Sequence, residues 1–322
     1  MKAIRYHQYG GPEVLTLEEV DQPAVGDDDV LIRVRASSVN PLDNYAMRGT
    51  PYVVRLQAGL SRPKDPGLGF DIAGVVEAVG KGVSAFEPGD EVIAWRQGAF
   101  AEYVVLRADG VIVHKPERIT FEQAAAVPVA GLSALQAVRD KGGLAAGQRV
   151  LVNGAAGGVG SFAVQIAVAH GAEVTGVCGT TGVDLVRSLG AAKVVDYTTD
   201  DFTATGPYDL IIDTAGSRTL REYRRTLTRK GVYVGVGGPV RGNWIQPLLG
   251  PLRTVLYSPF VSQSMRPFLS RENRDDLATL ADLMADDRVT PVVGDTFPLD
   301  AVPDAIRKFA KGHVHGKFVI IV

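Results

Sequence analysis

The stretch Val150-Leu151-Val152-Asn153-Gly154-Ala155-Ala156-Gly157-Gly158-Val159-Gly160 decides the fold of this chain. It joins a short apolar run to a glycine-rich turn, and an apolar helical pattern follows from Val159 to Ala169. Read as G-x-G-x-x-G, the turn has Ala155 in the first position, then Gly157 and Gly160. This pattern between a strand and a helix is typical of a loop that binds the pyrophosphate of a dinucleotide.

Each glycine has its own task in such a loop. The missing Cβ of Gly157 lets the backbone approach a pyrophosphate, and Gly160 lets the helix pack closely on the strand. The first N–H groups of the helix and its partial positive charge face the phosphates. A glycine-rich turn that holds no ligand is the alternative. The cofactor-binding residues predicted in this loop are Ala156, Gly157, Gly158, Val159 and Gly160.

Strand and helix patterns alternate on both sides of the loop, which predicts a parallel, doubly wound sheet. The predicted strands are 150–152, 173–178, 193–195, 209–212 and 232–236. The predicted helices are 159–169, 183–189 and 217–227.

The chain before residue 120 is different, because short β patterns punctuated by Gly and Pro predict a sheet that closes on itself. These strands are 30–35, 73–79, 91–95, 101–106 and 111–114. Thr120, with Gln123 three residues later, predicts a helix start of the capping-box type. Near the C-terminus we expect helices over 273–286 and 302–310 and a last strand over 317–322.

Length and composition limit the possible functions. A chain of 322 residues suggests two domains, and 46% hydrophobic with 22% charged residues is typical of a soluble globular protein. The net charge of −2, without a basic stripe, argues against a nucleic-acid partner. The single cysteine, Cys178, excludes an intrachain disulfide. No stretch has the pattern of a secretory signal or a membrane span, so we expect a cytoplasmic protein without a membrane partner.

Several further segments carry a family resemblance. In chain order they are Ser38-Val39-Asn40-Pro41-Leu42-Asp43, Gly69-Phe70-Asp71-Ile72-Ala73-Gly74-Val75-Val76, Pro88-Gly89-Asp90-Glu91-Val92, Gly98-Ala99-Phe100-Ala101-Glu102-Tyr103, the loop at 155–160, and Val194-Val195-Asp196-Tyr197. With these segments the sequence resembles the zinc-independent branch of the medium-chain dehydrogenases/reductases, the quinone oxidoreductase and zeta-crystallin group. The resemblance covers nearly the whole chain.

The resemblance implies an α/β protein with two domains. Residues 1–123 would form the N-terminal part of a GroES-like β-barrel catalytic domain, and 124–258 a Rossmann domain that binds NAD(P). Residues 259–322 would return to the catalytic domain. We expect a homodimer on the basis of this resemblance, with the apolar strand 232–236 near an exposed sheet edge, where it would pair with its symmetry mate.

The same resemblance assigns site residues. Asn40 would lie beside the nicotinamide, with Asp43, Tyr45 and Arg48 in the same cleft, and Tyr197 would lie near the adenosine phosphate. Local roles are the alternative. Asn40 and Asp43 would then cap a turn and the short helix that follows, and Tyr45 and Arg48 would be surface residues of that helix.

No metal site is predicted. Zinc-dependent relatives place a Cys and a His-Glu pair where this chain has Asn40 and Phe70-Asp71, and thiolate and imidazole are the ligands that zinc prefers. We interpret His313 and His315 as turn and strand residues rather than ligands.

The cofactor preference is predicted from the end of strand 173–178. An acid there would bind the ribose diol of NADH, but the chain continues Gly179-Thr180-Thr181-Gly182. Thr180 and Thr181 can offer hydroxyl groups, although no cation is visible. We therefore predict NADPH over NADH by a modest margin, with NADH still possible.

Without a metal to polarise a carbonyl, hydride transfer favours acceptors that spread charge by conjugation. The predicted substrate is a small quinone or an α,β-unsaturated carbonyl, with Tyr45 as the candidate proton donor or solvent in its place. Alternatives are a metal-free alcohol dehydrogenase, an acyl-chain enoyl reductase, or a non-catalytic NADPH-binding protein. An RNA-binding role has little support from the charge.

Overall fold

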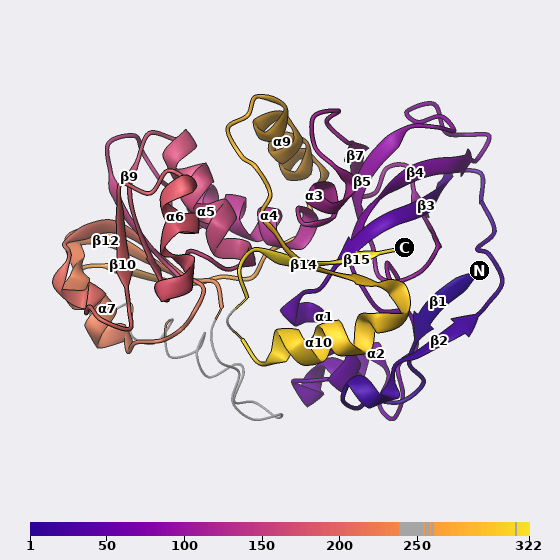
Figure 1. Cartoon of the computed structure of the whole chain (residues 1–322), viewed down its shortest axis with the longest axis horizontal. Helices are drawn as coiled ribbons and strands as arrows, with labels where there is room; N and C mark the ends of the chain where they lie inside the picture. The colour runs from indigo at the N-terminus through magenta and orange to yellow at the C-terminus, as the bar shows by residue number, and fades with distance from the viewer. Residues whose placement is uncertain (238–253, 255–257, 259–260, 313) are drawn as a thin grey trace. The chain divides into compact units, whose positions relative to one another are not determined.

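The computed structural model describes residues 1–237, 254, 258, 261–312 and 314–322 (Figure 1). The chain divides into two compact units. Unit 1 consists of Met1–Ala130, Glu272–Asp286 and Pro291–Val322, and unit 2 of Gly131–Arg271 and Asp287–Thr290. The N- and C-terminal parts of the chain thus share unit 1. The sequence-based boundaries at 123/124 and 258/259 stay predictions.

Unit 2 contains a six-stranded sheet in the order β10-β9-β8-β11-β12-β13. Its strands are β8 (Arg149–Asn153), β9 (Glu173–Cys178), β10 (Lys193–Asp196), β11 (Tyr208–Asp213), β12 (Leu227–Gly235) and β13 (Ser264–Pro267). All neighbouring strands run parallel. The strand order reverses at β8, which pairs with β9 on one side and β11 on the other. The predicted doubly wound parallel sheet is therefore confirmed.

Three helices follow strands of this sheet and provide the crossover connections that parallel neighbouring strands need. They are α5 (Gly158–Ala169), α6 (Val183–Ser188) and α7 (Leu220–Thr226). Helix α5 contacts β8 and β9, α6 contacts β10, and α7 contacts β12. The apolar sequence of α5 is explained by its position, because residues 160–167 are all buried.

One expectation about this sheet is wrong. Strand 232–236 was expected near a sheet edge, but β12 pairs with β11 on one side and with β13 on the other. The sequence analysis did not assign β13, which has only four residues and lies more than twenty residues further along the chain. The edge strands of the described sheet are β10 and β13.

Unit 1 contains the second large sheet, in the order β14-β15-β3-β4-β5-β7, with β6 paired to β3. Its strands are β3 (Asp29–Ser38), β4 (Asp71–Val79), β5 (Glu91–Trp95), β6 (Tyr103–Arg107), β7 (Ile112–His114), β14 (Val293–Pro298) and β15 (Lys317–Ile321). Strand β3 organises this sheet. It pairs with β4, with β6 through residues 29–33, and with β15 through residues 36–38.

The remaining elements of unit 1 are shorter. A separate antiparallel pair consists of β1 (Lys2–Arg5) and β2 (Thr16–Glu19). The helices are α1 (Pro41–Arg48), α2 (Arg55–Ala58), α3 (Phe121–Ala125), α9 (Arg274–Ala285) and α10 (Val302–Ala310), and α4 (Pro128–Leu135) continues into unit 2. The capping box predicted at Thr120 and Gln123 is present. Helix α10 has the predicted bounds.

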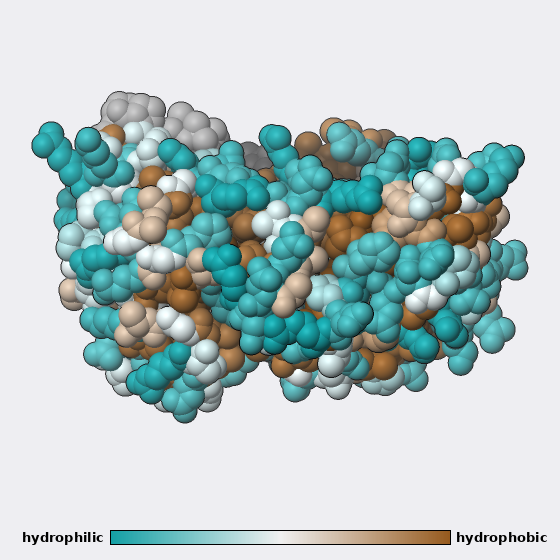
Figure 2. Space-filling model, turned by 90° about the horizontal axis from the view of Figure 1, so that it is seen from above, coloured by the Kyte–Doolittle hydropathy of each residue, from teal (hydrophilic) through white to brown (hydrophobic). Residues whose placement is uncertain are grey.

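The surface mixes residue types. Figure 2 shows hydrophilic and hydrophobic residues interspersed on the visible face. Within the described ranges, no helix combines the length and the apolar character needed to span a bilayer.

Candidate cofactor and active site

The glycine loop lies at the carboxyl end of β8, where the strand order of the sheet reverses. Gly157 is the N-cap of α5 and has an extended backbone, with φ −79° and ψ 175°. A Cβ at Gly160 would lie 2.0 Å from the Gly154 carbonyl oxygen, so only glycine fits there. A Cβ at Gly157 would lie 3.4 Å from that same oxygen, which is an ordinary contact.

The two glycines therefore answer different demands. Gly160 is required because α5 approaches the loop backbone at Gly154 and Ala155 closely, whereas the protein itself leaves room for a Cβ at Gly157. The space that a Cβ would fill lies at the N-terminus of a helix, where backbone N–H groups lack intrahelical partners. This geometry is compatible with a pyrophosphate held by the residues predicted from the sequence, Ala156, Gly157, Gly158 and Val159. Their role in binding stays a prediction.

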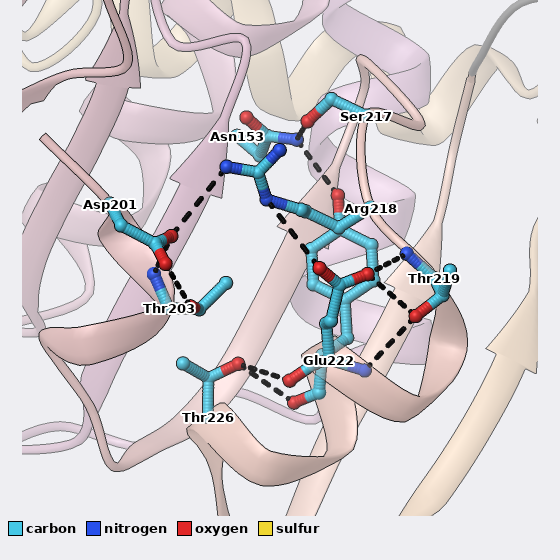
Figure 3. Close-up of polar contacts among 9 residues, drawn as sticks. Asn153, Asp201, Thr203, Ser217, Arg218, Thr219, Glu222 and Thr226 are labelled. Atoms are coloured by element: carbon cyan, nitrogen blue, oxygen red, sulfur yellow. Dashed lines mark hydrogen bonds and ion pairs between the residues drawn. The ribbon is translucent and has the colours of Figure 1, made fainter. Parts of the chain in front are cut away.

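A buried polar network holds the ends of β8 and β11 together beside the loop. Asn153 Nδ2 donates to Asp213 Oδ1 at 2.8 Å and to Tyr223 Oη at 2.9 Å. Tyr233 Oη donates to Asp213 Oδ2 at 2.8 Å. Burial, followed by the Asp213 carboxylate, raises the pKa of both Tyr223 and Tyr233, so their hydroxyls stay protonated. Figure 3 shows Asn153 directed toward Ser217 at the same end of the sheet.

The segment before α7 is fixed by charge. The Arg218 guanidinium lies 3.6 Å from an Asp201 carboxylate oxygen and 4.0 Å from a Glu222 carboxylate oxygen. Figure 3 shows it between these two side chains. Thr219 caps α7 by accepting the amide hydrogen of Glu222, whose carboxylate accepts from the Thr219 amide at 2.8 Å. Because Thr219 is the cap, the helix begins three residues later than the predicted 217.

The ends of β9 and β10 lie side by side, since Asp196 pairs in register with Cys178. Tyr197 lies over the turn that follows β9, because a Cβ at Gly179 would be 3.3 Å from Tyr197 Oη. Thr180 Oγ1 is 3.0 Å from Thr198 Oγ1. The structure thus brings together Thr180 and Tyr197, and it adds an acid, Asp196, that the sequence analysis did not consider at this place.

In unit 1, the Asn40 side chain is buried and fully engaged by the protein. Its Nδ2 donates to Asp71 Oδ2 at 2.8 Å and to the Ser38 carbonyl oxygen at 3.3 Å. Its Oδ1 accepts from the Lys317 ammonium. These contacts fix the orientation of the amide. A catalytic or cofactor contact of Asn40 stays a prediction.

Two members of this cluster, Asp71 and Lys317, were not predicted as site residues. Lys317 Nζ lies 3.3 Å from Asp71 Oδ2, and their side chains are 4% and 0% exposed. Asp71 Oδ2 also accepts from the Ser38 hydroxyl. Asp71 Oδ1 accepts from the Val129 amide, in the first turn of α4, at 2.8 Å. The sequence signal was a lysine directly before the apolar run Phe318-Val319-Ile320-Ile321.

Helix α1 carries the other predicted catalytic residues. Asp43 is buried, and its Oδ2 accepts from the Asn40 amide at 2.6 Å, as the local capping interpretation expects. The pKa of Asp43 is raised to about 8, because the effect of burial outweighs the opposing effect of that hydrogen bond. Burial also raises the pKa of the half-buried Tyr45. Arg48 is exposed and donates to Asn44 Oδ1 at 2.9 Å.

His7, His313 and Cys178 are the remaining residues to place. His7 pairs with Glu18 at 3.0 Å on the surface of unit 1. His313 lies outside the described residues. Cys178 is buried, and burial followed by the nearby Asp196 raises the pKa of its thiol to about 11. Within the described part of the chain, no three His, Cys, Asp or Glu residues are grouped as metal ligands.

Comparisons with known proteins agree with this architecture. Residues 26–117 match the alcohol dehydrogenase GroES-like domain, and residues 189–320 match the zinc-binding dehydrogenase model. The human mitochondrial NAD(P)H oxidoreductase RTN4IP1 is 34% identical over 363 residues, covering 100% of this chain and 89% of that protein.

Solved structures give the same result. The quinone oxidoreductase from Coxiella burnetii is 30% identical, with a TM-score of 0.86 over 100% of this chain and 99% of that one. The Escherichia coli quinone oxidoreductase, solved with NADPH, is 25% identical with a TM-score of 0.81 over 100% of both chains.

A doubly wound parallel sheet and a GroES-like domain in one chain are the architecture of a two-domain class of oxidoreductases. The chain belongs to the medium-chain dehydrogenase/reductase family, and its relatives include quinone oxidoreductases.

Proposed function

We propose that this protein is a zinc-independent NAD(P)H-dependent oxidoreductase that reduces a small quinone or an α,β-unsaturated carbonyl. The observation that carries the proposal is the glycine loop at the strand-order reversal, with a vacant Cβ position at Gly157. In doubly wound sheets, dinucleotides bind at this place. The loop at 156–160, Thr180, Thr181 and Tyr197 would hold the cofactor. A bound reduced nicotinamide supplies the hydride.

Zinc independence is supported by the chemistry around Asn40. The oxygens available there for a cation, Asn40 Oδ1 and Asp71 Oδ2, both contact the Lys317 ammonium. An ammonium thus already neutralises the carboxylate that a metal ion would need. The cluster also lacks thiolate and imidazole ligands, which zinc prefers over amide oxygen.

Activity should therefore survive removal of metals. We expect kcat/KM to be unchanged after prolonged treatment with a chelator, because no step of the proposed reaction needs a Lewis acid. Elemental analysis of the purified protein is the second measurement. One tightly bound zinc ion per chain, whose removal abolishes activity, would contradict the proposal.

The class of hydride acceptor is proposed from the metal-free chemistry of the site. Conjugation in a quinone or enone spreads the negative charge that hydride transfer leaves, so little electrophilic assistance is needed. The protein's task is to orient the acceptor and exclude water. Burial raises the pKa of Tyr45 above its usual value, which makes its hydroxyl a weaker proton donor, and solvent can serve in its place.

Product analysis tests the choice of acceptor. With an α,β-unsaturated ketone, we expect the saturated ketone as the product. An allylic alcohol would instead favour the metal-free alcohol dehydrogenase. Turnover confined to acyl-chain thioesters would favour the enoyl reductase. Tight binding of NADPH without turnover of any acceptor would favour the non-catalytic binding protein.

We also propose a homodimer in the cytoplasm, on the family resemblance alone. Strand β12 lies inside the sheet, and β13 is an edge strand of the sheet as far as the structure describes it. A continuous sheet across the dimer would therefore have to pair through β13 rather than β12. Light scattering at micromolar concentration should give twice the monomer mass of 34.2 kDa. A monomer mass across that concentration range would overturn this part of the proposal.

A further inference from the structure

The adenosine end of the proposed cofactor site contains a carboxylate from an unexpected strand. In Rossmann domains the acid that binds the ribose diol follows the second strand, here β9. This chain has Gly179 and Thr180 there instead. Asp196 ends the neighbouring strand β10, pairs in register with Cys178, and remains partly exposed.

The hydroxyl groups around Asp196 donate their hydrogen bonds toward its carboxylate. Thr198 Oγ1 donates its single hydrogen to Asp196 Oδ1 at 2.7 Å, and the Thr198 amide donates to the same oxygen at 2.9 Å. Thr180 Oγ1 lies 3.0 Å from Thr198 Oγ1. Since the Thr198 hydrogen is already used, the single hydrogen of the Thr180 hydroxyl has Thr198 Oγ1 and the Asp196 carboxylate, whose pKa this hydroxyl lowers, as its acceptors. The Thr180 hydroxyl therefore has lone pairs, and no hydrogen, left for a ligand.

The charge of Asp196 persists at neutral pH. Hydrogen bonds from the Thr180 hydroxyl, and then from the Thr198 amide and hydroxyl, lower the pKa of Asp196. The negative charge also reaches the end of β9, because it adds to burial in raising the pKa of Cys178. The neighbouring Arg187 pairs with Asp184 at 3.2 Å.

We propose that Asp196, together with Thr180 and Thr198, is the cofactor-specificity device of this protein, accepting the ribose 2′-hydroxyl of NADH and opposing the 2′-phosphate of NADPH. The inference rests on the proposed function. A 2′-hydroxyl can donate to the free lone pairs of Thr180, whereas a phosphate has no hydrogen to give and meets a carboxylate. Asp196 thus reduces the preference for NADPH over NADH that the sequence of segment 179–182 alone predicts.

The test is the ratio of NADPH to NADH affinity in Asp196→Asn. Equilibrium binding is measured by the fluorescence of the reduced dinucleotides, and kcat/KM with one quinone is measured beside it. Asparagine keeps an oxygen for Thr198 but removes the charge. We expect the ratio to rise about tenfold in favour of NADPH, the order expected for a carboxylate and a phosphate dianion at contact distance in water. The rise should shrink at high salt.

Asp200→Asn is the matched control, because it removes the same charge from an exposed residue four positions away whose carboxylate contacts Thr199. We expect less than a twofold change there. An unchanged ratio in Asp196→Asn, or an equal rise in both variants, would overturn the inference while leaving the proposed function standing. Failure of the natural protein to bind either dinucleotide would overturn both.

Discussion

Gly157→Val is expected to abolish measurable dinucleotide binding while the protein remains folded. The backbone of Gly157 is extended, a conformation that valine adopts readily, and a Cβ there meets only the Gly154 carbonyl oxygen at 3.4 Å. The side chain would therefore occupy the space proposed for the pyrophosphate. We expect an affinity loss of at least about a hundredfold, or roughly 2.7 kcal/mol.

Titration with NADPH and NADH, together with a thermal melt, checks this result. Gly160→Ala is the contrasting variant, because its Cβ would lie 2.0 Å from a backbone oxygen and the helix would have to move. That variant should lose stability with or without cofactor, by about 1–3 kcal/mol. If Gly157→Val is folded and binds both dinucleotides as tightly as the natural protein, the pyrophosphate does not lie at this loop.

Lys317→Met is expected to destabilise the protein by about 3–5 kcal/mol, because the Asp71 carboxylate would be left buried without its cation. For a unit of this size, that loss corresponds to a fall in Tm of roughly 10 °C. Calorimetry measures it. Lys81→Met is the control, since Lys81 and Asp27 form an exposed pair at 3.0 Å whose loss should change Tm little.

The double variant Lys317→Met/Asp71→Asn separates charge from packing. Removing the uncompensated carboxylate should restore part of the lost stability, because a neutral amide costs less to bury than an unpaired charge. If the single variant melts like the natural protein, the pair does not organise the Asn40 cluster. If the double variant is no more stable than the single one, packing of the lysine stem, rather than charge, is what matters.

Local patterns predicted much of this fold. Strands β5 and β9 and helix α10 have the predicted bounds, and α5 begins one residue early. Each of these elements is encoded by periodicity and caps within its own segment. Strand β13 was missed because four residues carry almost no periodic signal, and its partner β12 ends more than twenty residues earlier in the chain. That omission is why β12 was mistaken for an edge strand.

The candidate site was predictable where one segment builds it. The glycine loop and Tyr197 were found from sequence, and the capping contact of Asp43 was among the alternatives considered. Asp71 on β4 and Lys317 on β15 meet because both strands pair with β3, and the pairing of β15 with β3 spans more than 270 residues of sequence. Asp196 reaches the β9 turn only because β9 and β10 lie in register. No spacing rule in the sequence shows such meetings.

Initial rates of NADPH and NADH oxidation by metal-stripped protein, with and without a quinone or an enone, test the central claim most directly. The proposed function predicts oxidation that depends on the acceptor, saturates with dinucleotide, persists in chelator and disappears in Gly157→Val. Oxidation that requires added zinc, or none with any quinone or enone while the dinucleotide binds tightly, would contradict it.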